Sequence, residues 1–223
     1  MTTLAPAQGY ALWAPTYAAE TAVSALEASV VASLDVPLAG KRVLDVGCGI
    51  ARRLAAAREA GASIALGVDL TPAMLAQARD EPLLAAADAR ALPVADGAFD
   101  VVWCRLVLGH LSALEPAYRE LARVCAPEGL VLVTDFHPEA ATAGHRRTFR
   151  DVDGALHELE NHVHRVLAHR VAASRAGLAL RERRDGTVGD SVREFYERAG
   201  RLDVYDRQRG LPRVLALVFA RAG

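Results

Sequence analysis

The segment that most constrains the fold begins at Lys41 and runs Lys-Arg-Val-Leu-Asp-Val-Gly-Cys-Gly-Ile. Its apolar run at 43–46 is typical of a short buried strand, and the Gly-Cys-Gly turn at 47–49 lets the backbone approach a ligand closely. A helical pattern follows at 50–60, and Asp69 ends the next apolar run 20 positions after the second glycine. A strand, glycine loop, helix and acidic residue at this spacing are typical of parallel α/β sheets that bind a nucleoside. We therefore expect an adenosine-containing cofactor.

Two features of the loop favour one adenosine cofactor over another. A dinucleotide loop carries Gly-x-Gly-x-x-Gly because its helix N-terminus must receive a pyrophosphate, but Arg52 stands where the third glycine would be. Asp45, two residues before the first glycine, would repel a phosphate. The same carboxylate suits a ligand that carries an ammonium group and a sulfonium centre. The residues therefore favour S-adenosylmethionine (SAM) over NAD.

The loop resembles the first motif of class I SAM-dependent methyltransferases, hydrophobic-Asp-hydrophobic-Gly-x-Gly-x-Gly. Later motifs of that family are similar, in order, to the segments 67–75, 87–93, 99–104 and 121–134, so the resemblance covers roughly residues 40–137. It departs at Ala51, where the family usually has its third glycine, and at Cys125-Ala126, where a Leu-Lys or Leu-Arg pair is common. Neither departure removes a residue of the expected cofactor site.

The resemblance implies a role for several residues. Asp69 would take the two ribose hydroxyls of SAM, Asp88 and the following N–H would contact the adenine, and Asp45 would support the methionine end. Met74 is equally consistent with core packing. The full implied cofactor site consists of Tyr17, Asp45, Gly47, Cys48, Gly49, Asp69, Leu70, Met74, Asp88, Ala89 and, through its backbone, Arg105.

Strand and helix patterns alternate along the chain. The pattern predicts strands at 42–46, 64–69, 84–87, 99–104, 130–135, 178–184 and 214–220, and helices at 15–36, 50–60, 72–79, 115–125, 164–176 and 192–199. Such alternation predicts a doubly wound, mostly parallel seven-stranded α/β sheet of the Rossmann-like methyltransferase kind, with its last strand antiparallel. Residues 1–14 are expected to be loosely structured, 155–163 to be strand-like and 201–211 to be a turn-rich loop.

The length fits a single domain. We expect residues 1–40 to form an N-terminal helical cap, 41–135 the cofactor-binding core, and 136–223 substrate-side elaborations with the last two strands. Tyr10, Trp13 and Tyr17 resemble the Tyr-x-x-Trp-Ala-x-x-Tyr segment of small-molecule methyltransferases, which closes over cofactor and substrate. Packing of this segment onto the sheet is the alternative.

Two histidines are candidates for a catalytic base. Methyl transfer from SAM is an in-line displacement for which a protein mainly aligns the nucleophile and excludes water, but a phenol, thiol or acidic carbon also benefits from a base. His110 follows the fourth strand and His137 follows the fifth, so both are expected at the carboxyl edge of the sheet. Alternatively, each hydrogen-bonds a loop carbonyl.

The composition of the chain indicates which classes of binding partner and which compartment to expect. A formal net charge of −1 supports neither nucleic acid nor an acidic membrane as a partner. Three cysteines without metal-ligand spacing favour a reducing cytoplasm and no metal, and no signal peptide or long apolar stretch is evident. Lys41 is the only lysine, which we interpret as a GC-rich, bacterial genome. Monomer and homodimer both remain open.

We therefore expect a cytoplasmic SAM-dependent methyltransferase that acts on the oxygen, nitrogen or carbon atom of a small organic acceptor. The resemblance places it with quinone-, biotin- and natural-product-pathway enzymes, in cofactor or secondary metabolism. One alternative is a protein that binds SAM without consuming it, as a cyclase or a non-catalytic partner would. An NAD-linked oxidoreductase is the other.

Overall fold

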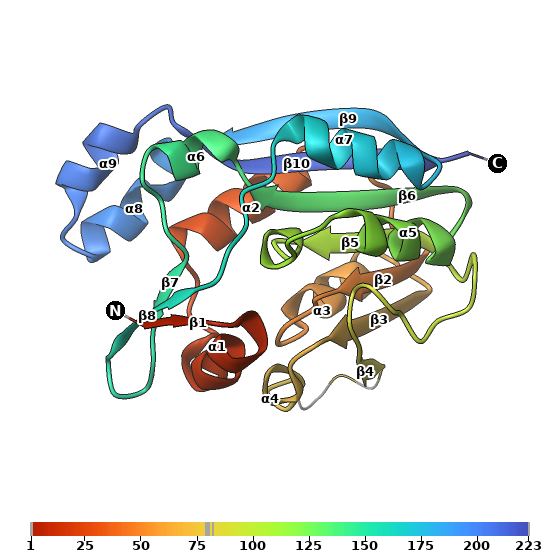
Figure 1. Cartoon of the computed structure of the whole chain (residues 1–223), viewed down its shortest axis with the longest axis horizontal. Coiled ribbons are helices and arrows are strands. Elements are labelled where there is room, and N and C mark those ends of the chain that lie inside the picture. Colours follow the sequence, from red (N-terminus) through yellow and green to blue (C-terminus); the bar gives the residue numbers. More distant parts are fainter. Residues whose placement is uncertain (1, 79–80, 82, 223) are drawn as a thin grey trace.

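A seven-stranded sheet forms the centre of the molecule (Figure 1). The computed structural model describes residues 2–78, 81 and 83–222. The strands lie in the order β4-β3-β2-β5-β6-β10-β9. All pairs from β4 to β6 are parallel, whereas β10 is antiparallel to both of its neighbours. The predicted doubly wound sheet is confirmed. Its strands are β2 (Arg42–Val46), β3 (Ile64–Asp69), β4 (Leu84–Ala86), β5 (Phe99–Arg105), β6 (Cys125–Phe136), β9 (Leu178–Thr187) and β10 (Pro212–Arg221).

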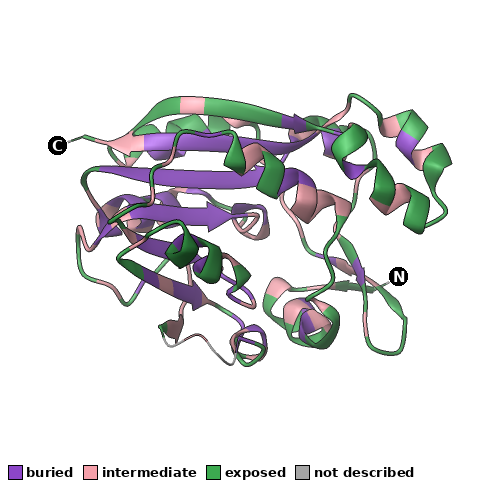
Figure 2. Cartoon of the chain, turned by 180° about the vertical axis from the view of Figure 1, so that it is seen from behind, coloured by how far each residue is buried: buried purple, intermediate pink, exposed green. Residues whose placement is uncertain are grey.

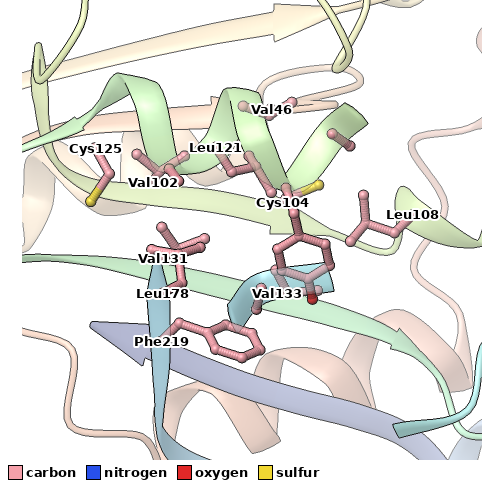
Figure 3. Packing of buried hydrophobic residues seen from close by; sticks show 14 of the residues in the cluster. Val46, Val102, Cys104, Leu108, Leu121, Cys125, Val131, Val133, Leu178 and Phe219 are labelled. Carbon is pink, nitrogen blue, oxygen red and sulfur yellow. The ribbon is translucent and has the colours of Figure 1, made fainter. Parts of the chain in front are cut away.

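Helices cover both faces of the sheet, because alternate strand residues point to opposite sides. Val46, Val102 and Val131 pack under α5 (Glu115–Val124) and α7 (Val166–Arg175), in the cluster drawn in Figure 3. The intervening residues, among them Val43, Val101 and Leu132, pack instead against α3 (Arg52–Glu59) and α2 (Ala22–Ala32). Figure 2 shows the inner strands as the most buried part of the chain.

The N-terminal segment is ordered, so the prediction of a loose segment at 1–14 is wrong. It contains β1 (Thr2–Leu4), α1 (Pro6–Trp13) and the 3-10 turn η1 (Ala14–Thr16). β1 pairs in parallel with β8 (Leu156–Leu159), which pairs in turn with β7 (Thr148–Arg150), so that a second, three-stranded sheet forms. Figure 1 shows this sheet and α1 together at one end of the main sheet.

Several predicted boundaries change. The helix expected at 15–36 begins only at α2, where the Thr21 side chain accepts the Ser24 N–H and the Ser24 side chain accepts the Thr21 N–H in a capping box. The segment 201–211 contains α9 (Leu202–Gln208) rather than a loop, next to α8 (Asp190–Arg198). The helix predicted at 72–79 is observed as α4 (Pro72–Leu75), and its predicted last residue, Arg79, lies outside the described residues. The remaining elements are η2 (Leu108–His110) and α6 (Pro138–Thr142).

β6 starts five residues earlier than the apolar pattern indicates. Its first residue pairs with Phe99, and the ladder then shifts so that Val101 pairs with Leu130. Glu128, inside the shifted stretch, has φ 62°. The polar bulge hides the start of this strand from a hydrophobic pattern. Among the described residues, no helix has both the length and the apolar character to cross a bilayer.

Because only one side of each covering helix packs on the sheet, substitutions of a buried and of an exposed helical leucine should differ greatly in their effect on the free energy of unfolding. Leu121 on α5 is fully buried, whereas Leu167 on α7 is 65% exposed. We expect Leu121→Ala to lower the free energy of unfolding by about 2–5 kcal/mol, because it leaves a cavity. Leu167→Ala should change it by less than about 0.5 kcal/mol. Urea denaturation measures both, and equal losses would contradict the assigned packing.

Candidate functional site

The glycine loop after β2 is held in a conformation that excludes side chains. Gly47 and Gly49 have φ values of 75° and 58°, and a Cβ atom on Gly47 would lie 2.2 Å from a methyl group of Val107. The N–H groups of Gly47 and Cys48 donate to the carbonyl of Val68 at 2.7 and 3.0 Å. Ala51, with φ 60°, is the left-handed residue before α3. The loop therefore presents bare backbone at the carboxyl end of the sheet.

Asp69 ties this loop to the end of β3. One carboxylate oxygen accepts the N–H of Gly49 at 2.8 Å, and the other accepts the N–H of Thr71 at 2.8 Å. Burial raises the pKa of the Asp69 carboxyl, and the two backbone donors act in the opposite direction. Each oxygen keeps a free lone pair, so the carboxylate can accept further hydrogen bonds from a ligand.

A cavity of about 510 Å³ opens beside the loop, within the usual size range of small-molecule sites. Most of the predicted cofactor residues and one predicted base line it. These are Tyr17, Gly47, Cys48, Gly49, Asp69, Leu70, Met74, Asp88, Ala89, Arg105 and His110. Segment 136–163 contributes Arg147, Glu160 and His162, whereas none of the lining residues comes from 190–212. That segment packs on α2 instead, where Val192 and Tyr205 meet Leu26.

Two predicted site residues lie outside the cavity lining. The carboxylate of Asp45 is fully buried, and neither oxygen has a hydrogen-bond partner among the described residues. Burial raises the pKa of this carboxyl. His137 is also buried, and its ring accepts the N–H of Glu139 at the start of α6. His137 follows β6 at the carboxyl edge of the sheet, as predicted, but its backbone pairs with Arg213 of β10, its ring caps α6, and it is not among the residues that line the cavity.

The side chain of Arg105 makes a buried ion pair that sequence analysis missed. Its Nε and Nη2 atoms each lie 2.7 Å from an oxygen of Glu27 on α2, and Thr134 donates to the same carboxylate at 2.8 Å. Burial alone would raise the pKa of Glu27, but Arg105 and the other donors hold it below its usual value. The pair joins α2 to the end of β5. No local pattern indicates it, because the partners are 78 residues apart.

Tyr10, His110 and Arg147 form a hydrogen-bonded group at the other end of the cavity. His110 Nδ1 lies 3.1 Å from the carbonyl oxygen of Glu160, and its Nε2 lies 3.1 Å from the Tyr10 hydroxyl. Because a carbonyl only accepts, Nδ1 carries the proton and Nε2 accepts from Tyr10. Arg147 donates to the Tyr10 hydroxyl and, at 3.1 Å, to the carbonyl of Leu106. Burial, aided by the charge of Arg147, lowers the pKa of His110 to about 3.

The N-terminal aromatic residues form one cluster beside the loop. Tyr10 stacks on Trp13 at 5.8 Å between ring centroids, and Trp13 meets Tyr17 edge-on at 4.8 Å. A Cβ atom on Gly49 would lie 3.7 Å from the Tyr17 ring. The cluster borders the cavity, because Tyr10 and Tyr17 are among its lining residues.

Metal ligands do not gather in the part of the chain that the structure describes: it holds no group of three or more His, Cys, Asp or Glu residues that could bind an ion. All three cysteines are buried free thiols.

Comparisons with known proteins agree with this geometry. Residues 44–133 match a family model described as a methyltransferase domain. Malonyl-acyl carrier protein O-methyltransferase of Halorhodospira halophila is 41% identical over 107 residues, which cover 44% of this chain and 36% of the relative. Demethylmenaquinone methyltransferase of Thermus thermophilus is 39% identical over 109 residues, which cover 45% of this chain and 49% of the relative. The chain thus spans half or less of the length of these relatives.

The fold has close counterparts among solved structures. An S-adenosylmethionine-dependent methyltransferase from Mesorhizobium loti superposes with a TM-score of 0.68 at 22% sequence identity. The superposition covers 88% of this chain and 98% of that chain. At this identity the likeness shows a shared fold.

The burial of His110 predicts that the folded protein loses stability as the pH falls. Its pKa of about 3 lies below the ordinary 6.5, so the unfolded chain takes up the proton first as the pH falls. The contribution of neutral His110 to the free energy of unfolding should be fully present above pH 6.5 and should be lost progressively as the pH falls toward 3. Between the two pKa values the slope due to His110 should approach about 1.4 kcal/mol per pH unit, because only the unfolded chain binds the proton there. Solvent screening of the partly exposed ring narrows this pH range.

Urea denaturation between pH 7 and pH 4 measures this slope. His110→Gln should lower it by the share of His110, while His145, whose pKa burial lowers to about 4, keeps its own share in both proteins. A slope identical in the parent and the variant would contradict the assigned burial.

Proposed function

We propose that this chain, which carries the methyltransferase domain of class I SAM-dependent methyltransferases, transfers a methyl group from SAM to a small organic molecule. The observation that carries the proposal is the convergence of the bare Gly47–Gly49 backbone, the Asp69 carboxylate and Asp88 on one cavity. These three features lie at the carboxyl ends of adjacent strands, where open α/β sheets bind ligands.

The cavity residues fit SAM in their chemistry. Asp69 would accept hydrogen bonds from the two ribose hydroxyls while it keeps its bonds to Gly49 and Thr71. The Ala89 N–H and the side chain of Asp88, which Arg90 holds in a bidentate ion pair, would meet the adenine. Asp45 would act through the loop above it rather than by contact. Tyr17 and the small residues Gly49 and Cys48 would line the methionine end, with Leu70 and Met74 as apolar walls and the backbone of Arg105 beside them.

SAM supplies a methyl carbon that the sulfonium group already activates. The protein's part is to hold the acceptor atom about 3 Å from that carbon, in line with the bond that breaks, and to keep water out. Tyr10 and Tyr17 are placed to cover the cavity once both ligands are bound. The names of the relatives support a small-molecule acceptor in cofactor or secondary metabolism.

We further propose that the protein works in the cytoplasm without a nucleic-acid partner. Its three cysteines remain free thiols, as in a reducing compartment, and its net charge of −1 provides no attraction to a phosphate backbone.

Cofactor binding is tested by calorimetric titration with SAM, S-adenosylhomocysteine and NAD. We expect micromolar binding of the first two and none of NAD. Asp69→Ala should weaken SAM binding at least about 10-fold, because hydrogen bonds to a charged group contribute about 1.5–3 kcal/mol each. Asp203→Ala, at an exposed residue of α9 paired with Arg207, is the matched control and should bind as the parent does.

Binding of NAD alone, or unchanged SAM affinity in Asp69→Ala, would contradict the proposal. Circular dichroism of each variant separates lost binding from lost folding. Turnover to S-adenosylhomocysteine with an acceptor present distinguishes methyl transfer from a protein that binds SAM without consuming it.

A further inference from the structure

Arg147 places a positive charge in the cavity, and none of the described carboxylates lies at ion-pair distance from it. We propose that Arg147 binds a carboxylate of the acceptor and that the reaction is methylation of this carboxylate to a methyl ester. The inference rests on the proposed transfer from SAM and names the acceptor class for the same site.

The guanidinium of Arg147 is oriented to bind an acceptor. Its guanidinium lies over the ring of Tyr10 at 5.7 Å and over the ring of Phe136 at 5.1 Å. It lines the main cavity and also a second cavity of about 260 Å³. A guanidinium held between two aromatic rings is already oriented, so little side-chain entropy is lost when it binds a planar anion.

The charge of Arg147 stands out among the arginines of the cavity. Arg53 and Arg105 pair with Glu27, and Arg90 pairs with Asp88. Within the described residues, Arg147 has no carboxylate at ion-pair distance. Its three donated hydrogen bonds end on neutral oxygens, those of Leu106 and Tyr10. Two of its five N–H groups therefore remain for a ligand.

The other charged groups nearby do not cancel this charge. Glu160 lines the same cavity, but its side chain is 54% exposed, so solvent screens its charge. Arg52 also lacks a carboxylate partner among the described residues, but it is exposed and lies against Tyr17, on the cofactor side. The acceptor end is thus electropositive at Arg147, which favours an anionic acceptor.

The two groups that are hydrogen-bonded beside Arg147, His110 and Tyr10, are poor proton acceptors. The accepting nitrogen of His110 is occupied by the Tyr10 hydroxyl, and the low pKa of its ring makes it a weak base. Burial raises the pKa of Tyr10. A phenol or a carbon acid needs a base near neutral pH, whereas a carboxylate is already ionised there. His110 is then a positioning residue that holds Tyr10 against Arg147.

The proposed step balances without a proton. One carboxylate oxygen, with the other held by Arg147, attacks the methyl carbon opposite the sulfur. The carbon–oxygen bond forms as the carbon–sulfur bond breaks, and the electron pair of that bond stays on sulfur. The products are a neutral methyl ester and S-adenosylhomocysteine. Because the ester has lost its charge, it also loses its attraction to Arg147, which favours release.

The experiment uses methyl-labelled SAM and acceptors in matched sets: aliphatic and aromatic monocarboxylates and half-thioesters of dicarboxylic acids, each beside its amide and the corresponding phenol or amine. Treatment of the products with base releases labelled methanol from methyl esters, but not from methyl ethers or from N- or C-methyl groups. We expect transfer to carboxylates only, with kcat/KM nearly constant from pH 6 to pH 9.

Three variants assign the effect to Arg147. Arg147→Gln should raise KM for the carboxylate about 10-fold or more, as expected for loss of a charge-assisted pair, with a smaller change in kcat. Arg147→Lys should restore part of the loss. Arg146→Gln is the matched control, because Arg146 is the exposed neighbour paired with Glu158 and lines only the second cavity.

A structural role of Arg147 is tested in the same proteins. Its guanidinium holds the carbonyl of Leu106, a residue with φ 60°, so its loss could distort the cavity. Unchanged SAM affinity of Arg147→Gln in calorimetry shows that the cofactor end is intact, and reduced SAM affinity would support a structural role instead.

Each remaining outcome decides one proposal. Lack of SAM binding in the parent overturns the proposed function. Bound SAM with transfer to phenols or amines, at a rate that rises with pH, overturns the carboxylate proposal alone. The carboxylate proposal is also overturned if SAM binds but no carboxylate of the set is methylated. The same holds if Arg147→Gln leaves the kinetics of carboxylate methylation unchanged.

Discussion

The hydrogen bond from the Gly49 N–H to the Asp69 carboxylate is the contact on which the site depends. It joins the glycine loop after β2 to the end of β3, two adjacent parallel strands, at 2.8 Å. The two glycines of the loop have no side chains that could hold it, and Gly47 cannot acquire one because Val107 fills the space. The acidic residue therefore has a structural role before any ligand arrives, and its remaining lone pairs face the cavity. In the proposed function, one carboxylate would both shape the site and contact its ligand.

Sequence patterns predicted the part of the fold that local chemistry determines. β2 and β3 begin and end where their apolar runs do, and ten of the eleven expected cofactor residues line one cavity. Contacts between distant segments could not be predicted. β1 has three residues and pairs with β8, more than 150 positions away, and Glu27 meets Arg105 across 78 positions. The position of His137 at the end of β6 was predicted, but its contacts with Arg213 of β10 and with the Glu139 N–H, which hold it outside the cavity lining, were not.

These long-range contacts determine the acceptor end of the cavity. The small sheet brings segment 147–162 against α1, and so sets Arg147 beside Tyr10 and the carbonyl of Glu160 beside His110. The residues proposed to hold the cofactor lie in the core sheet and in general motifs, whereas Arg147, proposed to bind the acceptor, lies in a segment outside that core. Methyltransferases of one fold can therefore keep their cofactor and change their acceptor, which is why fold alone does not name the substrate.

The central claim is that the cavity beside the glycine loop holds SAM. A crystal structure of the protein with S-adenosylhomocysteine tests it most directly. The account predicts the ribose hydroxyls within hydrogen-bonding distance of the Asp69 carboxylate, the adenine beside Asp88 and Ala89, and the sulfur facing the end of the cavity where Arg147 lies. A nucleoside bound elsewhere, or an Asp69 carboxylate that makes no contact with the ribose, would contradict it.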